Sequence, residues 1–474
     1  MNRFLLATLA VLPLKLEAQF TAREYAQRRD ALAARLPDAA VVVVLGAAEP
    51  PQDYLEFNQN PSMLYLTGIR EPDAALVMRK QGGQLTQVAF VLPRDPGAET
   101  WTGTRMGVEG AAKTLGIPAR ERRTLDAFLD SLASSRPSFF VVGELTGGNG
   151  DGVATRDDQL IAAAVRRNPG LRVVQANELV EELRGRKTPA ELALIRRAVE
   201  ITVEAQKEAI QAVRSNRNEY EIEALIEYVF RRNGSERPSF ATIVGSGPNS
   251  TTLHYNAADR LMQPGEIVVL DIGASYKGYA ADVTRTVPTS GTYSPEQRQV
   301  YQIVRDAQAA AERQAKPGMS ARAMNDSANA IIAAGLARLG LIEAPDATYD
   351  VVRGGQTQQM EQYRLYYMHG LGHGIGLEVH DPDQYYFAPG LIAEGSAFTI
   401  EPGIYVRGNL LETLADTPRN RALIARIRPA FERYRNIGIR IEDDYIVTDK
   451  GLEWISRAPR EIGEIEALMR KPVP

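Results

Sequence analysis

The chain has 474 residues, of which 44% are hydrophobic and 24% are charged, and its formal net charge is −4. These values exclude a disordered or fibrous protein, and the length allows two unequal domains or about three. The 55 basic and 59 acidic residues are well mixed and form no basic stripe, so we expect no nucleic-acid partner. The absence of cysteine excludes disulfides and thiol chemistry.

The first 18 residues resemble a secretory signal peptide. Arg3 precedes an apolar run from Phe4 to Leu14, and Ala18 ends the short stretch that follows. The run is shorter than the roughly 20 residues that span a bilayer, so we expect no stable membrane insertion. We therefore predict export to the periplasm or the medium. Charged residues near the cleavage site leave an amphipathic helix in a cytoplasmic protein as the alternative.

Residues 19–185 predict an α/β domain. Short apolar runs such as "AVVVVLG", "VAFVLP" and "SFFVVGEL" alternate with helical patterns such as "REYAQRRDALAARL", which indicates a largely buried sheet. A long helix is predicted to begin near Pro189, with Glu191 in its first turn. We place the domain boundary just before it, so that a second domain comprises residues 186–474.

The stretch "EIVVLDIGASYKGYAADVTRTV" predicts a β-hairpin with its turn at "YKG". If the turn is centred between Tyr276 and Lys277, Asp271 and Asp282 face each other across the two strands. Two like charges in that arrangement repel each other, and a bound cation would remove the repulsion. The alternative is that one aspartate is exposed at the tip of the hairpin.

Three of the four histidines lie together in "YMHGLGHGIGLEVHD", as His369, His373 and His380, and the fourth is His254 in "TTLHYN". Four glycines in seven residues argue against a helix, and hence against the helical zinc signature His-Glu-x-x-His. In an extended segment the first two histidines would share one face, with glycines on the other face permitting close approach of another backbone or an ordered loop. Histidines packed in the core are the alternative.

Two further acids lie within strand-like segments, Glu401 in "SAFTIEPGIYV" and Glu442 in "IGIRIEDDYIVT". A carboxylate in a buried strand is costly unless it is paired or binds a metal. For Glu401 the alternative is a salt bridge to an arginine such as Arg440. For Glu442 the alternative is exposure beside Asp443 and Asp444.

The segment from Arg407 to Arg435 separates these two strand-like stretches. It is rich in Arg, Leu and Ala, which predicts a helical insertion between two strands. Such an insertion could cover the site or build an oligomer contact, and the sequence does not distinguish the two roles.

In order and spacing, these segments resemble the aminopeptidase P and prolidase type of metallopeptidase. The resemblance rests on "HYN", "LDIGASYKGYAADVTRT", "MHGLGHGIGLEVHD", "TIEPGIYV" and "GIRIEDDYIVT". It extends to the first half through "FNQNPSMLYLTGIREPDAALVM" and "ETWTGTRMG", a region that methionine aminopeptidases lack. The resemblance implies an α+β protein in which an α/β N-terminal domain precedes a pita-bread catalytic domain.

The resemblance also implies a dinuclear metal site in which two of the acids bridge both ions. Its oxygen-rich donor set favours Mn²⁺, with Co²⁺ or Fe²⁺ as alternatives. One acid, Glu401, is suited to act as a proton shuttle as well. The implied metal ligands are Asp271, Asp282 (bridging), His373, Glu401 and Glu442 (bridging); the implied substrate-side histidines are His254, His369 and His380, and Arg440 is the implied arginine near a bridging acid.

The expected function is therefore that of a metal-dependent Xaa-Pro aminopeptidase, whose partners are proline-containing peptide substrates. A prolidase, which accepts only dipeptides, is the nearest alternative. A non-catalytic pita-bread binding protein is disfavoured because all five implied ligands are present. Relatives of this type are commonly dimers or tetramers, so a homo-oligomer is expected.

Overall fold

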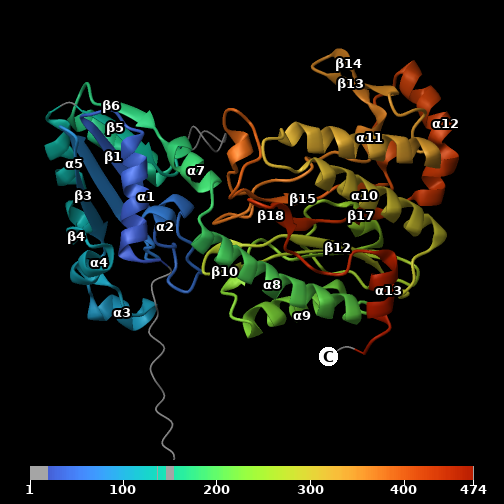
Figure 1. The fold of residues 1–474 in the computed structure, drawn as a ribbon, viewed down its shortest axis with the longest axis horizontal. Coiled ribbons are helices and arrows are strands. Elements are labelled where there is room, and N and C mark those ends of the chain that lie inside the picture. Colours follow the sequence, from blue (N-terminus) through green and yellow to red (C-terminus); the bar gives the residue numbers. More distant parts are fainter. Residues whose placement is uncertain (1–19, 136, 146–153, 473–474) are drawn as a thin grey trace, which may run out of the picture. The chain divides into compact units, whose positions relative to one another are not determined.

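The computed structural model describes residues 20–135, 137–145 and 154–472, and the predicted signal peptide lies outside these residues. The chain divides into two compact units, which end and begin at Val180 and Glu181 (Figure 1). The boundary predicted from the sequence lies close by, after residue 185. Within the described ranges, no helix combines the length and the apolar character needed to cross a membrane.

The first unit is an α/β structure. Its elements in chain order are α1 (Ala22–Ala34), β1 (Ala40–Leu45), α2 (Pro61–Thr67), β2 (Ala75–Gln81), β3 (Gln84–Val91), α3 (Pro96–Thr102), α4 (Gly107–Leu115), β4 (Ala119–Glu121), η1 (Arg122–Thr124), α5 (Leu125–Ala133), β5 (Ser138–Val142), α6 (Arg156–Arg167) and β6 (Arg172–Gln175), followed by α7 (Asn177–Gly185) at the junction. The described strands form one sheet in the order β4-β3-β2-β1-β5-β6, with β1 antiparallel to β2 and parallel to β5. Every residue of β1 is buried, as its unbroken run of apolar, mostly β-branched side chains predicts.

The second unit places its strands between pairs of helices (Figure 1). Its elements are α8 (Pro189–Ala212), α9 (Glu219–Arg232), β7 (Arg237–Pro238), β8 (Ile243–Ser246), η2 (Gly247–Thr251), β9 (Ile267–Ile272), β10 (Ala274–Tyr276), β11 (Tyr279–Ala280), β12 (Val283–Pro288), α10 (Pro295–Gln314), α11 (Ala321–Leu339), β13 (Thr348–Arg353), β14 (Gln356–Glu361), η3 (Gln362–Leu365), η4 (Gln384–Tyr386), β15 (Ala397–Ile400), β16 (Gly403–Tyr405), η5 (Leu410–Glu412), α12 (Pro418–Tyr434), β17 (Gly438–Arg440), β18 (Asp443–Thr448), β19 (Gly451–Trp454) and α13 (Ile462–Met469). Helices α8 and α9 lie on one side of the strands, and α10 and α11 on the other.

Helix α8 begins where the sequence predicts. Pro189 is its first residue, and the Thr188 side chain accepts a hydrogen bond from the Glu191 amide while the Glu191 carboxylate bonds the Thr188 amide. This reciprocal capping satisfies amide groups that the helix itself leaves unpaired. The helix then buries its apolar face against strands β9 to β12, which carry the predicted aspartates.

The predicted hairpin is present, but its predicted register is wrong. Strands β9 and β12 pair Asp271 with Thr284, so the two aspartates are not directly opposed. The turn is centred on Lys277 and Gly278, whose φ values of 50° and 84° are those that a two-residue hairpin turn requires. Asp282 lies two residues before Thr284, which makes the aspartates diagonal neighbours on one face of the pair.

The predicted helical insertion is confirmed. Helix α12 occupies Pro418–Tyr434, between β16 and β17, and these two strands pair with each other, Gly403 with Arg440 and Tyr405 with Gly438. The chain therefore leaves the strand pair after Tyr405, forms the helix and returns to pair with the strand that it left. This return places Arg440 opposite Gly403, two residues after Glu401.

The backbone of the turn gives a prediction for stability. Gly278→Ala places a Cβ at a positive φ, so we expect the free energy of unfolding of the second unit to fall by about 1–2 kcal/mol. Gly463→Ala is the control, because Gly463 lies in helix α13 with open space around it and no positive φ; there alanine should leave stability unchanged or raise it. Urea unfolding of both variants tests this, and equal midpoints would contradict it.

Candidate metal centre

One cavity of about 510 Å³ contains every predicted site residue. Its apolar lining includes Phe240, Ile243, Leu253 and Val379. The fold thus brings together segments from the whole second unit. The predicted residues that line it are His254, Asp271, Asp282, His369, His373, His380, Glu401, Arg440 and Glu442.

The four acids lie in or next to strands that meet at this cavity. Asp271 is in β9, Asp282 immediately precedes β12, Glu401 follows β15, and Glu442 joins β17 to β18. Asp271, Asp282 and Glu442 are only 7%, 6% and 2% exposed. This burial excludes both the exposed-tip alternative for the aspartates and the exposed alternative for Glu442.

His373 faces the acids through one ring nitrogen. Its Nε2 lies 3.5 Å from Asp282 Oδ2, 3.7 Å from Glu401 Oε1 and 3.9 Å from Glu442 Oε1. Its Nδ1 lies 3.1 Å from the carbonyl oxygen of Gly374, so a hydrogen on Nδ1 leaves the Nε2 lone pair directed at the carboxylates. A metal-binding histidine commonly donates its second ring N–H to a carbonyl in this way.

Each of three acids keeps one oxygen unpaired. Asp271 Oδ1, Asp282 Oδ1 and Glu442 Oε1 are buried and have no hydrogen-bond partner among the described residues. A buried oxygen without a partner is costly, and bound cations would satisfy these oxygens. Ligand atoms of Asp282, His373 and Glu442 lie within 4.8 Å of one another, and Asp271 and Glu401 line the same cavity. The residues present therefore fit a hard divalent cation.

The protonation states agree with this fit. Burial, followed by the charge of neighbouring acids, raises the pKa of Asp282 and of Glu401 well above the usual range and that of Glu442 to about 7. Burial, followed by the charge of His380, lowers the pKa of His373 to about 4. The imidazole is thus neutral and able to bind metal, while the acids need positive charge to ionise together.

Arg440 connects two of the predicted residues. Its guanidinium pairs with Asp271 Oδ2 rather than Glu401, which excludes the proposed Glu401 salt bridge, and it also donates to the Tyr405 hydroxyl at 2.9 Å. That hydroxyl lies 2.9 Å from His369 Nε2, and His369 Nδ1 lies 2.7 Å from the Gly370 carbonyl oxygen. With the hydrogen on Nδ1, Arg440 donates to the Tyr405 hydroxyl, the hydroxyl donates to His369 Nε2, and His369 Nδ1 donates to the Gly370 carbonyl.

Sequence reasoning missed two residues of the site, Tyr405 and Thr284. The Thr284 hydroxyl donates to Glu442 Oε2 at 2.7 Å and accepts from Arg440 Nε at 3.2 Å. Both residues lie inside motifs that carry the family resemblance, Tyr405 in "TIEPGIYV" and Thr284 in "DVTRT". The available signal was their spacing from the acids, because Thr284 lies two residues after Asp282 and Tyr405 four residues after Glu401. Residues two or four apart on a strand share a face.

The histidine-rich segment is an ordered extended loop against β15. A Cβ at Gly372 would lie 2.1 Å from the Thr399 carbonyl oxygen, and one at Gly374 would lie 2.3 Å from that of Asp381, so glycine permits these close approaches as expected. The rings of His373 and His380 lie 4.0 Å apart. His380 and His254 are exposed, which excludes core packing for both.

The buried acids and neutral imidazole that converge on one cavity are those of a metalloenzyme. Residues 193–449 match the model of metallopeptidase family M24, and residues 25–141 match that of the aminopeptidase P, N-terminal domain. The chain belongs to metallopeptidase family M24. It is a hydrolase, and its family implies that divalent metal ions bind at the group formed by Asp282, His373 and Glu442.

Relatives match over nearly the whole chain. A Xaa-Pro aminopeptidase of Haemophilus influenzae is 33% identical, with 95% of this chain and 98% of the relative covered. A human Xaa-Pro dipeptidase is 31% identical, with 91% and 89% covered. The structure of a variant of Escherichia coli aminopeptidase P in complex with substrate matches with a TM-score of 0.79 at 30% identity, covering 95% and 98%. The predicted family and the predicted α+β, pita-bread fold class are confirmed.

The raised pKa of Glu442 predicts a pH dependence of metal binding. Because the pKa of Glu442 is about 7, its carboxyl in the metal-free protein holds a proton below that pH, and a cation must displace it. His373, with a pKa of about 4, is already neutral there. We expect the apparent affinity for Mn²⁺ to rise about tenfold per pH unit per displaced proton between about pH 6 and 7. Calorimetry in buffers of different ionisation enthalpy measures this, and a pH-independent affinity would contradict it.

Proposed function

We propose that this chain is a dinuclear metal-dependent Xaa-Pro aminopeptidase, which releases the N-terminal residue from peptides with proline in the second position. The observation that carries the proposal is the set of unpaired carboxylate oxygens and a neutral imidazole in one cavity lined by every predicted site residue. Full-length similarity to Xaa-Pro aminopeptidases supports the substrate class.

For the metal we propose two divalent cations, Mn²⁺ first and Co²⁺ or Fe²⁺ as alternatives. Carboxylate-rich donor sets with one imidazole suit these ions. Bound there, the cations would polarise the scissile carbonyl and lower the pKa of water. The proposed ligands are Asp271, Asp282, His373, Glu401 and Glu442, with Asp282 and Glu442 shared between the two ions.

The proposed roles of the remaining residues follow from their positions. Glu401 Oε2 lies 3.7 Å from His369 Nδ1, and its raised pKa suits an acid that takes a proton and passes it to the leaving nitrogen. His369 has a pKa of about 4, so it is neutral, and we propose that its Nδ1–H donates to a substrate oxygen in place of the Gly370 carbonyl. His254 and His380 lie exposed at the cavity and are proposed to hydrogen-bond the peptide.

The cavity lining also suits proline. The nitrogen of an X-Pro bond has no N–H, so it cannot donate the backbone hydrogen bond on which recognition of an extended strand depends. Apolar side chains such as Phe240 and Val379 line the cavity beside the histidines and offer contact to the ring. We propose that ring contact, rather than a backbone hydrogen bond, selects the substrate.

Export and assembly remain proposals that rest on the sequence. We propose that residues 1–18 direct export and are removed, which the N-terminal sequence of the mature protein decides. We propose a homodimer or homotetramer, for which light scattering is the measurement. Helix α12, in the segment between the paired strands β16 and β17, is a candidate contact.

Peptide length separates the proposed function from its alternative. Metal-depleted protein is incubated with and without Mn²⁺ on an X-Pro dipeptide and an X-Pro-Y-Z tetrapeptide, and release of X is followed. We expect Mn²⁺-dependent cleavage of the tetrapeptide. Cleavage of the dipeptide alone would identify a prolidase instead, and cleavage of neither would favour the non-catalytic pita-bread protein.

The ligand set is tested by His373→Ala and Asp271→Asn. Each removes a proposed ligand, so we expect turnover to be lost and Mn²⁺ affinity to fall by more than about 100-fold. His380→Ala is the matched control, because the His380 ring lies 4.0 Å from the His373 ring but His380 is not a proposed ligand. This variant should still bind Mn²⁺. Full Mn²⁺-dependent turnover in either ligand variant would disprove the assignment.

A further inference from the structure

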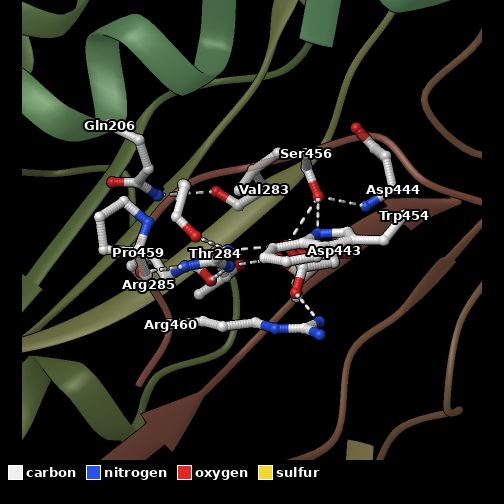
Figure 2. Close-up of polar contacts among 12 residues, drawn as sticks. Gln206, Val283, Thr284, Arg285, Asp443, Asp444, Trp454, Ser456, Pro459 and Arg460 are labelled. Carbon is white, nitrogen blue, oxygen red and sulfur yellow. Dashed lines mark hydrogen bonds and ion pairs between the residues drawn. The ribbon is translucent and has the colours of Figure 1, made fainter. Parts of the chain in front are cut away.

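Behind the metal centre, strand β12 is joined to the start of β18 by the guanidinium of Arg285 (Figure 2). The side chain is fully buried, at 0% exposure. All five of its N–H groups have an acceptor. The acceptors are the carbonyl oxygens of Pro459 (2.8 Å), Thr284 (2.8 Å), Glu442 (2.7 Å) and Ala458 (3.0 Å), and Asp443 Oδ1 (2.7 Å).

Residues 284 and 285 hold Glu442 at three points. The Glu442 amide donates to the Thr284 carbonyl at 3.1 Å, its carbonyl accepts from Arg285 Nη1 at 2.7 Å, and its carboxylate Oε2 accepts from the Thr284 hydroxyl. Asp282, just before β12, is connected to β18 by a hydrogen bond from its own amide to Asp444 Oδ2 at 3.1 Å. Hydrogen bonds between the start of β12 and the start of β18 therefore fix the positions of both Asp282 and Glu442, the two acids proposed to be shared between ions.

A buried anion anchors the guanidinium. Asp443 is fully buried, and its Oδ1 accepts from Arg285 and from the Ser456 hydroxyl at 2.6 Å. The planar fork of Arg285 is therefore held in one orientation.

Arg460 contacts the same carboxylate from the other side. Its Nη1 donates to Asp443 Oδ2 at 3.0 Å and to Glu312 Oε1 at 2.6 Å, and its guanidinium lies 3.6 Å from the centre of the Trp454 ring. These contacts stabilise the network without reaching the main chain of Glu442. The two arginines thus share one anion but differ in what else they hold.

We propose that Arg285 is a positioning residue for the metal centre, which holds the main chain of Glu442 against β12 so that the carboxylates of Glu442 and Asp282 keep the separation that a divalent cation requires. The inference rests on the proposed metal-dependent function. Lysine cannot take this role, because its ammonium is a point charge on a flexible stem with three donors, whereas five acceptors surround the guanidinium.

The experiment compares Arg285→Lys with Arg460→Lys in the full chain. Both keep the positive charge beside Asp443, and both should lower the apparent unfolding temperature of metal-depleted protein. Titration calorimetry with Mn²⁺ then separates them: Arg285→Lys should weaken binding by about 10- to 100-fold, whereas Arg460→Lys should stay within about threefold of the unmodified chain. With X-Pro-Y-Z peptide, kcat of Arg285→Lys should recover partly as Mn²⁺ is raised, with KM little changed.

The results distinguish a failure of the positioning role of Arg285 from a failure of the proposed metal-dependent function. If Arg285→Lys binds Mn²⁺ as tightly as Arg460→Lys, the positioning role is wrong and the proposed function is untouched. If the unmodified chain binds neither Mn²⁺ nor Co²⁺, the proposed function fails and this inference fails with it. Should Arg285→Lys not fold, the double variant Arg285→Met/Asp443→Leu removes both charges together, which avoids leaving either buried alone; the same loss of Mn²⁺ affinity is expected, and unchanged affinity would overturn the inference.

Discussion

Mutual repulsion among four carboxylates in one cavity is the constraint on which the rest of the second unit depends. Asp271, Asp282, Glu401 and Glu442 come from separate strand ends, and the pKa values of three of them are raised because burial and neighbouring charge disfavour ionisation. Arg440 compensates only Asp271 by direct contact. Cations at the unpaired oxygens would supply the remaining positive charge, so the same residues that strain the metal-free protein would become its ligands.

The scaffold behind the site is polar, which is unusual for the interior of a protein. Arg285, Asp443, Arg460 and Ser456 form a hydrogen-bonded group where an apolar core would be expected (Figure 2). Buried ion pairs contribute little net stability because desolvation offsets their attraction, but removing one partner is strongly destabilising. Their directional hydrogen bonds fix positions more narrowly than apolar contacts do, and a metal site needs that precision.

Much of the site was accessible to sequence reasoning because its residues are chemically out of place. Acids inside apolar strands and histidines clustered in glycine-rich sequence conflict with ordinary burial rules, so a binding function was the simplest explanation. Arg285 gave no such signal, because its partners are mainly carbonyl oxygens, and every residue has one. The register of the hairpin was mispredicted because it depends on which two residues adopt positive φ, and "YKG" permits more than one choice.

By itself, the sequence determined the family, the α+β fold class, the helical insertion and nine of the residues that line the cavity, because these depend on residue types, their order and their spacing. Only the tertiary structure decided that Arg440 pairs with Asp271, that Thr284 and Arg285 hold Glu442, and which carboxylate oxygens remain unpaired. Arg440 and Asp271 are 169 positions apart, and Arg285 and Asp443 are 158 apart. No local pattern encodes contacts over such separations, since they arise only when the strand ends meet.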